Sequence, residues 1–329
     1  MPFVPNRRRA VHALSALLAA TALPLRAQGS GYPDRAIRFV VPFGAGGNVD
    51  GVGRLLAAAM GPLLGQAIVV DNRAGAGGSL GAGVVAQGPA DGYTLLVGSN
   101  GPLTINPFVQ AKLAYQLQDF APIALAGVVP HVLIVHNDVP ARTLQELIAL
   151  SQQGAVSCAS SGIGSATQLT MERFNALTGA RLLHVPYRGG NSLVPDLLGG
   201  ATQAASMEFS TALPLHKAGK ARIVAIASAQ RSPLAPELPT FIEGGARDFT
   251  AQSYVGLLAP ARTPAPILRK LEAAAGEALA APAMVERLQG LGLSAASAAE
   301  RGPAGFEALL RADYARSREA VRIAGIRPE

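Results

Sequence analysis

A local pattern that occurs twice in this 329-residue chain limits what it can fold into: a short β-branched run, a glycine-rich turn, and a segment of helical periodicity. In the first half the run spans Ile37 to Val41 and the turn spans Gly44 to Asp50. In the second half the run spans Val156 to Ala159 and the turn covers residues 160–165. Strands that are apolar on both faces and alternate with helices are typical of a parallel sheet covered by helices. The repeat therefore predicts an α/β fold in which each half contributes one mostly parallel sheet.

Two apolar segments indicate where the chain passes between the halves. The passage from Ile123 to Val135 leads out of the first half, and a strand expected at Tyr254 to Leu258 leads back, so that the helical tail from Pro264 rejoins it. We expect two lobes joined by a hinge of crossing strands, and these lobes comprise residues 28–128 with 253–329 and residues 129–252. The other expected strands are Ile68 to Val70, Thr94 to Val97, Leu182 to Val185, Ala204 to Phe209 and Ile223 to Ala227.

The N-terminus has the residue order of a cleavable secretory signal. Arg7 to Arg9 precede an apolar run from Val11 to Leu25, and Arg26 and Ala27 follow it. A membrane span needs roughly 20 apolar residues, and this run is shorter and is interrupted by polar residues. We therefore expect residues 1–27 to be removed and the mature protein to be soluble and periplasmic. The consecutive arginines leave both the general secretory and the twin-arginine export routes open.

Removal of this segment also changes the charge. It takes away four of the 28 basic residues and none of the 21 acidic ones, so the net charge falls from +7 to 24 − 21 = +3. A charge this small and dispersed argues against a nucleic-acid partner.

Residues that bind metals or carry redox chemistry are scarce. The single cysteine, Cys158, allows no internal disulfide and lies in an apolar stretch, where we expect a buried structural thiol. His131 and His136 are five residues apart in an expected strand, which directs their side chains to opposite faces. We expect neither a metal nor a cofactor.

The two glycine-rich turns are candidate binding sites because each opens a helix. The first turn of a helix presents unpaired backbone N–H groups and the positive end of the helix dipole, which together attract an anion without a basic side chain. Turns at 43–50 and 160–167 that face each other would hold one carboxylate ligand between them. The alternative is that the glycines only permit tight turns. Asp50 is similarly ambiguous, since an acidic residue at a helix start is most often a cap or dipole partner.

Two enzyme motifs occur outside the structural context that each requires. The dinucleotide pattern G-x-G-x-x-G/A fails at Val49 in the first turn, and its match at residues 81–86 lies in an expected helix. The hydrolase pattern G-x-S-x-G surrounds Ser79, but no strand runs directly into that serine, and nothing positions His184 or His216 as a base. We therefore expect no enzyme, with an exported serine hydrolase using Ser79 as the alternative.

Several segments in order resemble the Bug-type extracytoplasmic solute receptors, the substrate-binding components of tripartite tricarboxylate transporters. The resemblance covers nearly the whole mature chain. It is carried by Val41-Pro42-Phe43-Gly44-Ala45-Gly46-Gly47 with Asp50, Asn72-Arg73-Ala74-Gly75-Ala76-Gly77-Gly78, Asp91-Gly92-Tyr93-Thr94-Leu95-Leu96, Ile105-Asn106-Pro107, Ser160-Ser161-Gly162-Ile163-Gly164-Ser165, Val185-Pro186-Tyr187-Arg188-Gly189-Gly190 and Gly256-Leu257-Leu258-Ala259-Pro260.

The resemblance implies a two-lobed periplasmic binding protein of type II-like fold that closes on a small organic carboxylate. Its partners would be membrane transporter subunits or a sensor kinase. A sensor kinase would be the partner if the protein is an orphan carboxylate sensor without transport. A monomer is expected. The ligand-binding residues that we expect are Phe43, Gly44, Ala45, Gly46, Gly47, Asp50, Ser99, Asn100, Ser161, Gly162, Gly164, Ser165, Ala166, Thr167, Tyr187 and Glu208.

The chain departs from the family pattern at three places. Gln168 stands where relatives usually carry histidine, and Ala74 stands where they usually carry proline. The segment 206–209 replaces a common Phe-Asp-Asn near the expected cleft. Glu208 in that segment would repel a second carboxylate or attract an amino group, so an atypical ligand is expected.

Overall fold

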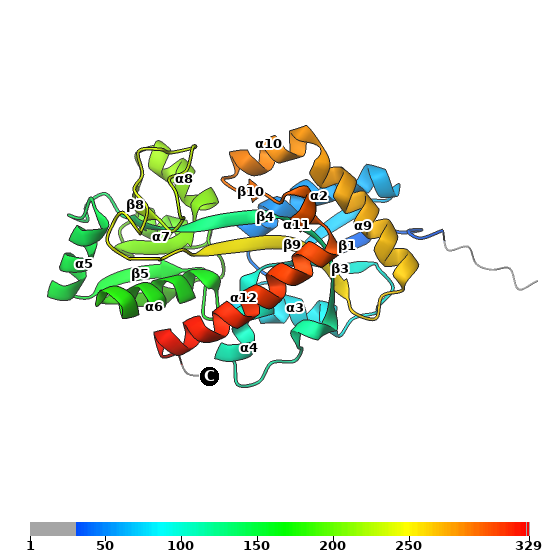
Figure 1. Cartoon of the computed structure of the whole chain (residues 1–329), viewed down its shortest axis with the longest axis horizontal. Coiled ribbons are helices and arrows are strands. Elements are labelled where there is room, and N and C mark those ends of the chain that lie inside the picture. Colours follow the sequence, from blue (N-terminus) through cyan, green and yellow to red (C-terminus); the bar gives the residue numbers. More distant parts are fainter. Residues whose placement is uncertain (1–30, 327, 329) are drawn as a thin grey trace, which may run out of the picture.

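The computed structural model describes residues 31–326 and 328, and the predicted signal segment 1–27 lies outside them. The described chain forms an elongated molecule in which one bent sheet runs along the long axis and helices cover both of its ends (Figure 1). Its strands are β1 (Ile37–Val41), β2 (Ile68–Asn72), β3 (Thr94–Gly98), β4 (Phe120–Val135), β5 (Val156–Ser160), β6 (Leu182–Pro186), β7 (Ala204–Glu208), β8 (Arg222–Ile226), β9 (Gln252–Pro260) and β10 (Ser294–Ala295).

The helices alternate with the strands in both halves, as the repeated pattern predicts. Longer helices pack on the sheet, and short turns η1 to η3 connect elements of the first half. They are α2 (Asn48–Leu64), η1 (Ala76–Gly78), α3 (Ser79–Ala86), η2 (Gly101–Ile105), α4 (Asn106–Val109), η3 (Leu117–Asp119), α5 (Leu144–Gln153), α6 (Ala166–Thr178), α7 (Val194–Leu198), α8 (Phe209–Lys217), α9 (Ala265–Ala280), α10 (Pro282–Gly290), α11 (Ala298–Arg301) and α12 (Pro303–Ala324).

The sheet consists of two parallel parts joined by long antiparallel strands. Its order is β2-β1-β3-β9-β4-β7-β5-β6, with β8 and β10 also paired to β4. Strands β1 to β3 are parallel to one another, as are β5 to β7. We call the part around β1–β3 the first lobe and the part around β5–β7 the second lobe. The predicted α/β architecture, with one mostly parallel sheet in each half, is confirmed.

Strand β4 belongs to both lobes. Its residues Phe120 to Pro130 pair with β9, and His131 to Val135 pair with β7 on one side. Strand β8 pairs along the same end of β4 on its other side. The predicted apolar passage at 123–135 is thus part of one continuous strand and ends where that strand ends. The predicted strand at 204–209 ends one residue earlier, because Glu208 is extended but already stands at the N-cap position of α8.

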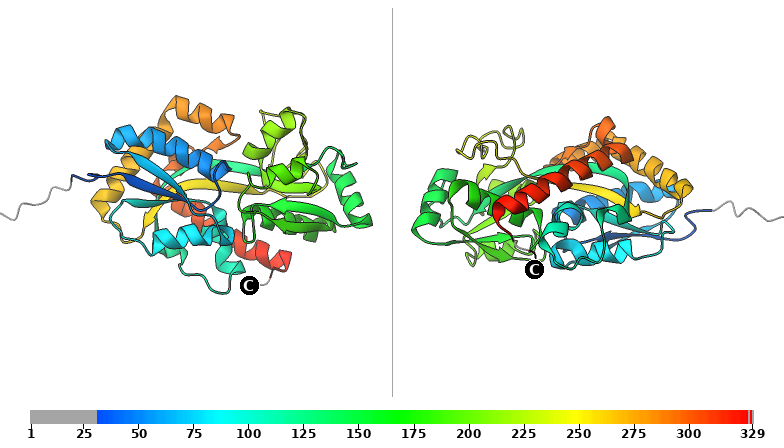
Figure 2. Two further views of the ribbon diagram at one scale, coloured as in Figure 1. Left: turned by 180° about the vertical axis from the view of Figure 1, so that it is seen from behind. Right: turned by 60° about the horizontal axis from the view of Figure 1, so that its bottom comes forward.

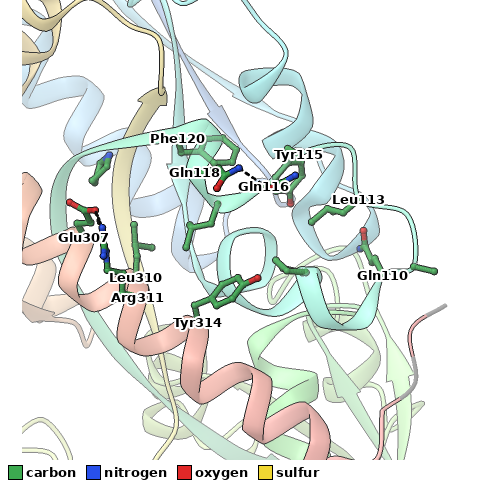
Figure 3. A pocket seen from close by; sticks show the side chains of 14 residues that line it. Gln110, Leu113, Tyr115, Gln116, Gln118, Phe120, Glu307, Leu310, Arg311 and Tyr314 are labelled. Atoms are coloured by element: carbon green, nitrogen blue, oxygen red, sulfur yellow. Dashed lines mark hydrogen bonds and ion pairs between the residues drawn. The ribbon is translucent and has the colours of Figure 1, made fainter.

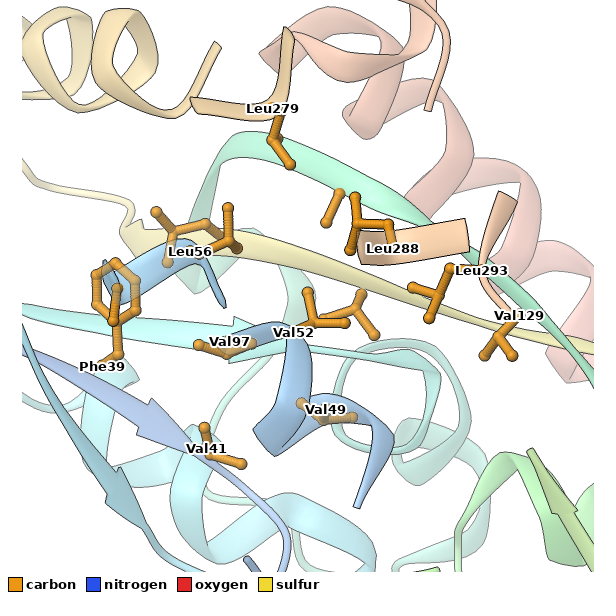
Figure 4. Close-up of a cluster of buried hydrophobic side chains, with 14 of the residues drawn as sticks. Phe39, Val41, Val49, Val52, Leu56, Val97, Val129, Leu279, Leu288 and Leu293 are labelled. Atoms are coloured by element: carbon orange, nitrogen blue, oxygen red, sulfur yellow. The ribbon is translucent and has the colours of Figure 1, made fainter. Parts of the chain in front are cut away.

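Helix α2 shows how the first lobe is packed. Val49, Val52 and Leu56 recur at helical spacing and are buried between the sheet and the helices α9 and α10 (Figure 4). The helix ends at Gly65, whose φ of 69° is the left-handed conformation that favours glycine at this position. Burial of these side chains therefore holds α2, including its start, against the core.

The C-terminal helix α12 lies across both lobes (Figures 1 and 2). Near its C-terminal end, Ala320 and Val321 pack with Leu169 of α6 in the second lobe and with Ile105 in the first. Closer to the middle of the helix, Asp313 Oδ2 accepts hydrogen bonds from Asn100 Nδ2 at 2.9 Å and Thr104 Oγ1 at 2.6 Å. The helix consequently contacts the first lobe, the crossing strand β4 and the second lobe.

Candidate functional site

The first glycine-rich turn is held in shape by Asp50. Helix α2 begins at Asn48, two residues before the end of the predicted turn, with Gly47 as an uncharged N-cap. Asp50 Oδ2 accepts hydrogen bonds from the Gly46 N–H at 2.8 Å and from Arg54 Nε at 2.9 Å. Its other oxygen accepts from Asn72 Nδ2 at 2.9 Å. Asp50 therefore acts as an acidic residue in the first helical turn and not as the N-cap residue.

These bonds also set the protonation state of Asp50. Burial disfavours its charge, but the hydrogen bonds from Arg54, Gly46 and Asn72 outweigh burial and lower the pKa of the carboxyl. Both oxygens are occupied by protein donors, so Asp50 supports the turn from behind the site.

The start of α2 leaves N–H groups and one side chain without protein partners. The first helical hydrogen bond runs from Gly51 N–H to Gly47 O, so the N–H groups of Asn48 and Val49 precede the helical ladder. The side chain of Asn48 is 8% exposed, and neither its amide nitrogen nor its oxygen has a hydrogen-bond partner. Buried amides without partners are rare and point to a binding site.

The second turn is built by its own polar side chains. Ser165 is the N-cap of α6 and accepts the Gln168 N–H at 3.2 Å, while Gln168 Oε1 accepts the Gly164 N–H at 2.7 Å. Thr167 Oγ1 accepts the Ser161 N–H at 2.9 Å. The buried Ser161 hydroxyl itself has no partner. This turn, like the first, contains a buried polar side chain without a partner.

Each turn touches the opposite lobe, the first turn at Arg188 and the second at Gly77 and Asn106, largely through main-chain atoms. The Gly44 N–H donates to Arg188 O at 3.2 Å. A Cβ atom placed on Gly77 would lie 2.3 Å from Ile163 O, and one placed on Gly164 would lie 2.1 Å from Asn106 Oδ1. Only glycine allows so close an approach of the two lobes.

Between the turns lies a small space that we call the inner cavity. Its volume is about 20 Å³, which is on the order of the room needed for one water molecule. The N-termini of α2 and α6, one from each lobe, both open on it. Its lining residues are Phe43, Gly47, Asn48, Val49, Ser99, Gly101, Ser161, Ser165, Ala166, Gly190, Glu208 and Ser253.

A neighbouring hollow of about 220 Å³, which we call the outer pocket, shares Phe43 and Ser161 with the inner cavity. It also contains Gly162 and Tyr187, two of the residues predicted from the sequence. The Tyr187 hydroxyl donates to Asp196 Oδ2 at 2.5 Å. The two spaces together form the candidate site.

Besides Gly162 and Tyr187 in the outer pocket, the structure distributes the predicted site residues over three positions. Phe43, Gly47, Ser99, Ser161, Ser165, Ala166 and Glu208 line the inner cavity. Gly44, Gly46 and Gly164 lie at the contact between the lobes, and Ala45 is exposed beside it. Asp50, Thr167 and Asn100 support the site by hydrogen bonds to other parts of the chain, which for Asn100 are Asp313 and the Tyr254 N–H.

Sequence reasoning missed five lining residues: Asn48, Val49, Gly101, Gly190 and Ser253. The first two lie inside the predicted binding turn 43–50, but they are absent from the residues named as ligand contacts. Gly190 lies in the segment 185–190, which carries part of the family resemblance, and that segment was the available signal for it. Gly101 and Ser253 belong to neither predicted turn, and only the folding of the chain brings them to the cavity.

Glu208 is the ionisable side chain among the lining residues, and it is 9% exposed. Burial raises the pKa of its carboxyl, and hydrogen bonds from its own N–H and from Ser253 offset this only in part. Ser253 Oγ in turn lies 2.8 Å from His131 Nε2, and His131 Nδ1 lies 2.6 Å from Thr170 Oγ1. Burial, together with Arg173, lowers the pKa of His131 to about 3, so this histidine is neutral.

The serine of the hydrolase motif is bonded to amides. Ser79 Oγ donates to Gln110 Oε1 at 2.8 Å and accepts from Asn106 Nδ2 at 2.6 Å. His184 is bonded to Ser160 and His216 to the Ile223 N–H, so neither faces Ser79. Cys158 is buried, and burial raises the pKa of its thiol to about 12.

Two larger hollows lie beside α12. One, of about 630 Å³, separates the loop at 107–122 from α12 and is lined by Tyr115, Phe120 and Tyr314 among others (Figure 3). The other, of about 720 Å³, lies beside α12 and contains Arg173 and Arg316. Within residues 31–326 and 328, no group of three acidic, histidine or cysteine side chains is placed to bind a metal. The same residues contain no helix with the length and apolarity of a membrane span.

Comparisons with known proteins agree with this geometry. The family model described as tripartite tricarboxylate transporter family receptor matches residues 52–307. The chain is 37% identical over 299 residues to a UPF0065 protein of a Pseudomonas species, covering 89% of this chain and 88% of that protein. It is 34% identical over 305 residues to Protein BugT of Bordetella pertussis, covering 92% and 94%.

Three solved structures are similar over their whole length. The periplasmic binding protein BugD has a TM-score of 0.86 and 33% identity, and the match covers 91% of this chain and 100% of that one. An R. palustris protein with adipate has a TM-score of 0.86 and 31% identity over 91% and 100%. MatC from Rhodopseudomonas palustris with bound malate has a TM-score of 0.84 and 32% identity over 88% and 100%. The likeness to a periplasmic binding protein over the whole length confirms the predicted fold class.

Proposed function

Because this chain belongs to the tripartite tricarboxylate transporter receptor family, whose members are solute-binding receptors and not enzymes, we propose that it captures a small organic carboxylate between its lobes. It then presents the ligand to the membrane subunits of a transporter of that type. Export after removal of residues 1–27 places it in the periplasm, the compartment of its relatives. The lobes correspond to residues 28–128 with 253–329 and to residues 129–252, and the protein acts as a monomer.

One observation supports carboxylate capture above the others. The N-termini of α2 and α6 come from different lobes and open on the same inner cavity. Each brings unpaired N–H groups and the positive end of a helix dipole, which favour an anion. The unpartnered side chains of Asn48 and Ser161 add polar contacts at the same place. The related structures with adipate and malate support a carboxylate as the ligand class.

Opening and closing follow from the same geometry. A ligand larger than a water molecule enters the inner cavity only when the lobes move apart, since the cavity measures about 20 Å³. Both helix N-termini reach the ligand only when the lobes come together again. The ligand therefore favours the closed arrangement through contacts that the open one lacks.

A thermal unfolding screen tests the receptor proposal. The purified protein is heated with mono-, di- and tricarboxylates and with amino acids. A ligand at 100 times its dissociation constant stabilises the folded state by about 2.7 kcal/mol, which raises the unfolding midpoint by roughly 5 °C or more. A panel in which no carboxylate shifts the midpoint contradicts the proposal. Loss of labelled-ligand uptake in cells lacking the gene then separates a transport receptor from a sensor.

A further inference from the structure

The inner cavity contains one acidic side chain and no basic one. Among its lining residues only Glu208 is ionisable, and its carboxylate reaches the cavity from the end of β7. One carboxylate oxygen lies near Gly190, 3.1 Å from where a Cβ atom would stand, and the hydroxyls of Ser161 and Thr211 surround the same position. These neighbours are uncharged.

Glu208 has no basic partner in the described part of the chain. The ion pairs of those residues involve other acidic groups, such as Asp50 with Arg54 and Asp313 with Arg316. A carboxylate buried without a countercharge is unfavourable, which is why burial raises its pKa. A cationic group that arrives with the ligand removes this penalty.

The lining of the inner cavity brings Glu208 and the two helix N-termini next to one another. Glu208 and the N-termini of α2 and α6 all line a space of about 20 Å³. A carboxylate bound at the helix N-termini therefore places its neighbouring carbon against Glu208. A second carboxylate on that carbon meets a like charge, whereas an ammonium group meets an opposite one.

The outer pocket provides room for the rest of such a ligand. It adjoins the inner cavity at Phe43 and Ser161 and has a volume of about 220 Å³. Ile163, Pro186 and Tyr187 give it a largely apolar wall. A side chain that leaves the same carbon can extend into this space.

We propose that the ligand is an α-amino acid whose carboxylate binds the N-termini of α2 and α6, whose ammonium group binds Glu208, and whose side chain occupies the outer pocket. This assignment rests on the proposed receptor function and narrows its ligand class. Glu208 is then the residue that distinguishes amino acids from plain carboxylates of similar size.

Matched ligand pairs test this assignment on the unaltered protein. Isothermal titration calorimetry at pH 7.5 compares L-alanine with propionate, L-leucine with 4-methylpentanoate, and L-aspartate with succinate, each pair differing by the amino group. In at least one pair the amino acid binds tenfold or more tightly than its partner. Tighter binding of the plain carboxylate in every pair that binds overturns the assignment.

The Glu208→Gln variant tests which residue is responsible. It keeps the shape of the side chain and removes its charge, so the preference for the amino acid falls at least tenfold while the plain carboxylate binds as well or better. Glu272→Gln, which removes one exposed charge from α9, keeps the wild-type preference. An unchanged preference in Glu208→Gln overturns the role of Glu208.

The two proposals fail in different ways. If a plain mono- or dicarboxylate binds and no amino acid does, the receptor function stands and the amino-acid assignment is wrong. If no compound in the panel binds to the wild-type protein, the receptor function itself fails. The ligand pairs decide this on the wild-type protein alone, whether or not the variant folds.

Discussion

Replacement of Gly77 by alanine should disfavour the closed arrangement of the lobes and weaken ligand binding. Gly77 lies in the first lobe, and a Cβ atom on it would stand 2.3 Å from the carbonyl oxygen of Ile163 in the second lobe. Carbon and oxygen atoms that are not bonded approach to about 3.0 Å at the closest. The main chain of Ile163 must therefore retreat by at least 3.0 − 2.3 = 0.7 Å.

The cost of this retreat applies to the closed arrangement. Forced overpacking of this kind costs about 1–3 kcal/mol, and a value of about 2 kcal/mol weakens ligand binding roughly 30-fold. The open arrangement avoids the contact altogether. In the open arrangement the variant still holds alanine in the left-handed conformation, since Gly77 has a φ of 59° and a ψ of 23°. That conformation lowers the free energy of unfolding by about 1 kcal/mol.

Gly65 provides a matched control. Its φ of 69° and ψ of 18° resemble those of Gly77, and a Cβ atom on it would have no neighbour within 4 Å. Gly65→Ala should therefore lose the same stability and keep the wild-type affinity. Calorimetric titration measures affinity, urea unfolding measures stability, and small-angle scattering with saturating ligand measures closure. Equal affinities of the two variants would refute the closing role of this contact.

Three further predictions concern single side chains. Ser161→Ala removes a buried hydroxyl that has no protein partner, so ligand affinity should fall about tenfold while the unfolding free energy stays level or rises; a loss of stability equal to the loss of binding energy speaks against a ligand contact. Asp50→Asn weakens the bonds to Arg54 and the Gly46 N–H and should lower the unfolding free energy at pH 7 by about 1–2 kcal/mol. The difference should be smaller at pH 3, because a carboxyl whose folded pKa is lowered loses its stabilising effect as the pH falls below its ordinary value of 3.8. His131 has a folded pKa of about 3 against an ordinary value of 6.5, so the unfolded chain alone binds a proton between these values. The contribution of His131 to the free energy of unfolding is therefore complete above pH 6.5 and declines by about 1.4 kcal/mol per pH unit below it. Urea unfolding should show a smaller loss of stability between pH 7 and pH 5 in His131→Asn than in wild type. Equal losses in the two proteins would contradict this.

The parts of the fold that depend on neighbours in sequence were predictable. The strand at Ile37 to Val41 has the predicted bounds, and the apolar passage at 123–135 is continuous strand. The start of α2 was placed too late because glycine and asparagine at 47 and 48 favour turns, whereas the structure makes Gly47 an N-cap and begins the helix at Asn48. Two lining residues of the inner cavity, Asn48 and Val49, therefore belong to the first turn of the helix.

The parts that depend on distant contacts were not predictable. Asn100 was expected to bind ligand, but its side chain is bonded to Asp313, which is 213 residues away on α12. Ser253 lines the cavity because β9 returns beside β4, a pairing that no local pattern specifies. The network of His131, Thr170 and Ser253 likewise joins three elements that only the fold brings together.

The contact between the lobes has a consequence for how such a receptor changes its ligand over evolutionary time. The lobes meet through the Gly44 N–H, the carbonyl groups of Arg188 and Ile163, and glycines that lack a Cβ atom. Substitution of most side chains leaves these atoms unaltered, so the contacts that join the closed lobes are separate from the side chains that select the ligand. A few exchanges around the cavity, of which residue 208 is the first candidate, can therefore redirect the protein to a new solute while its motion stays the same.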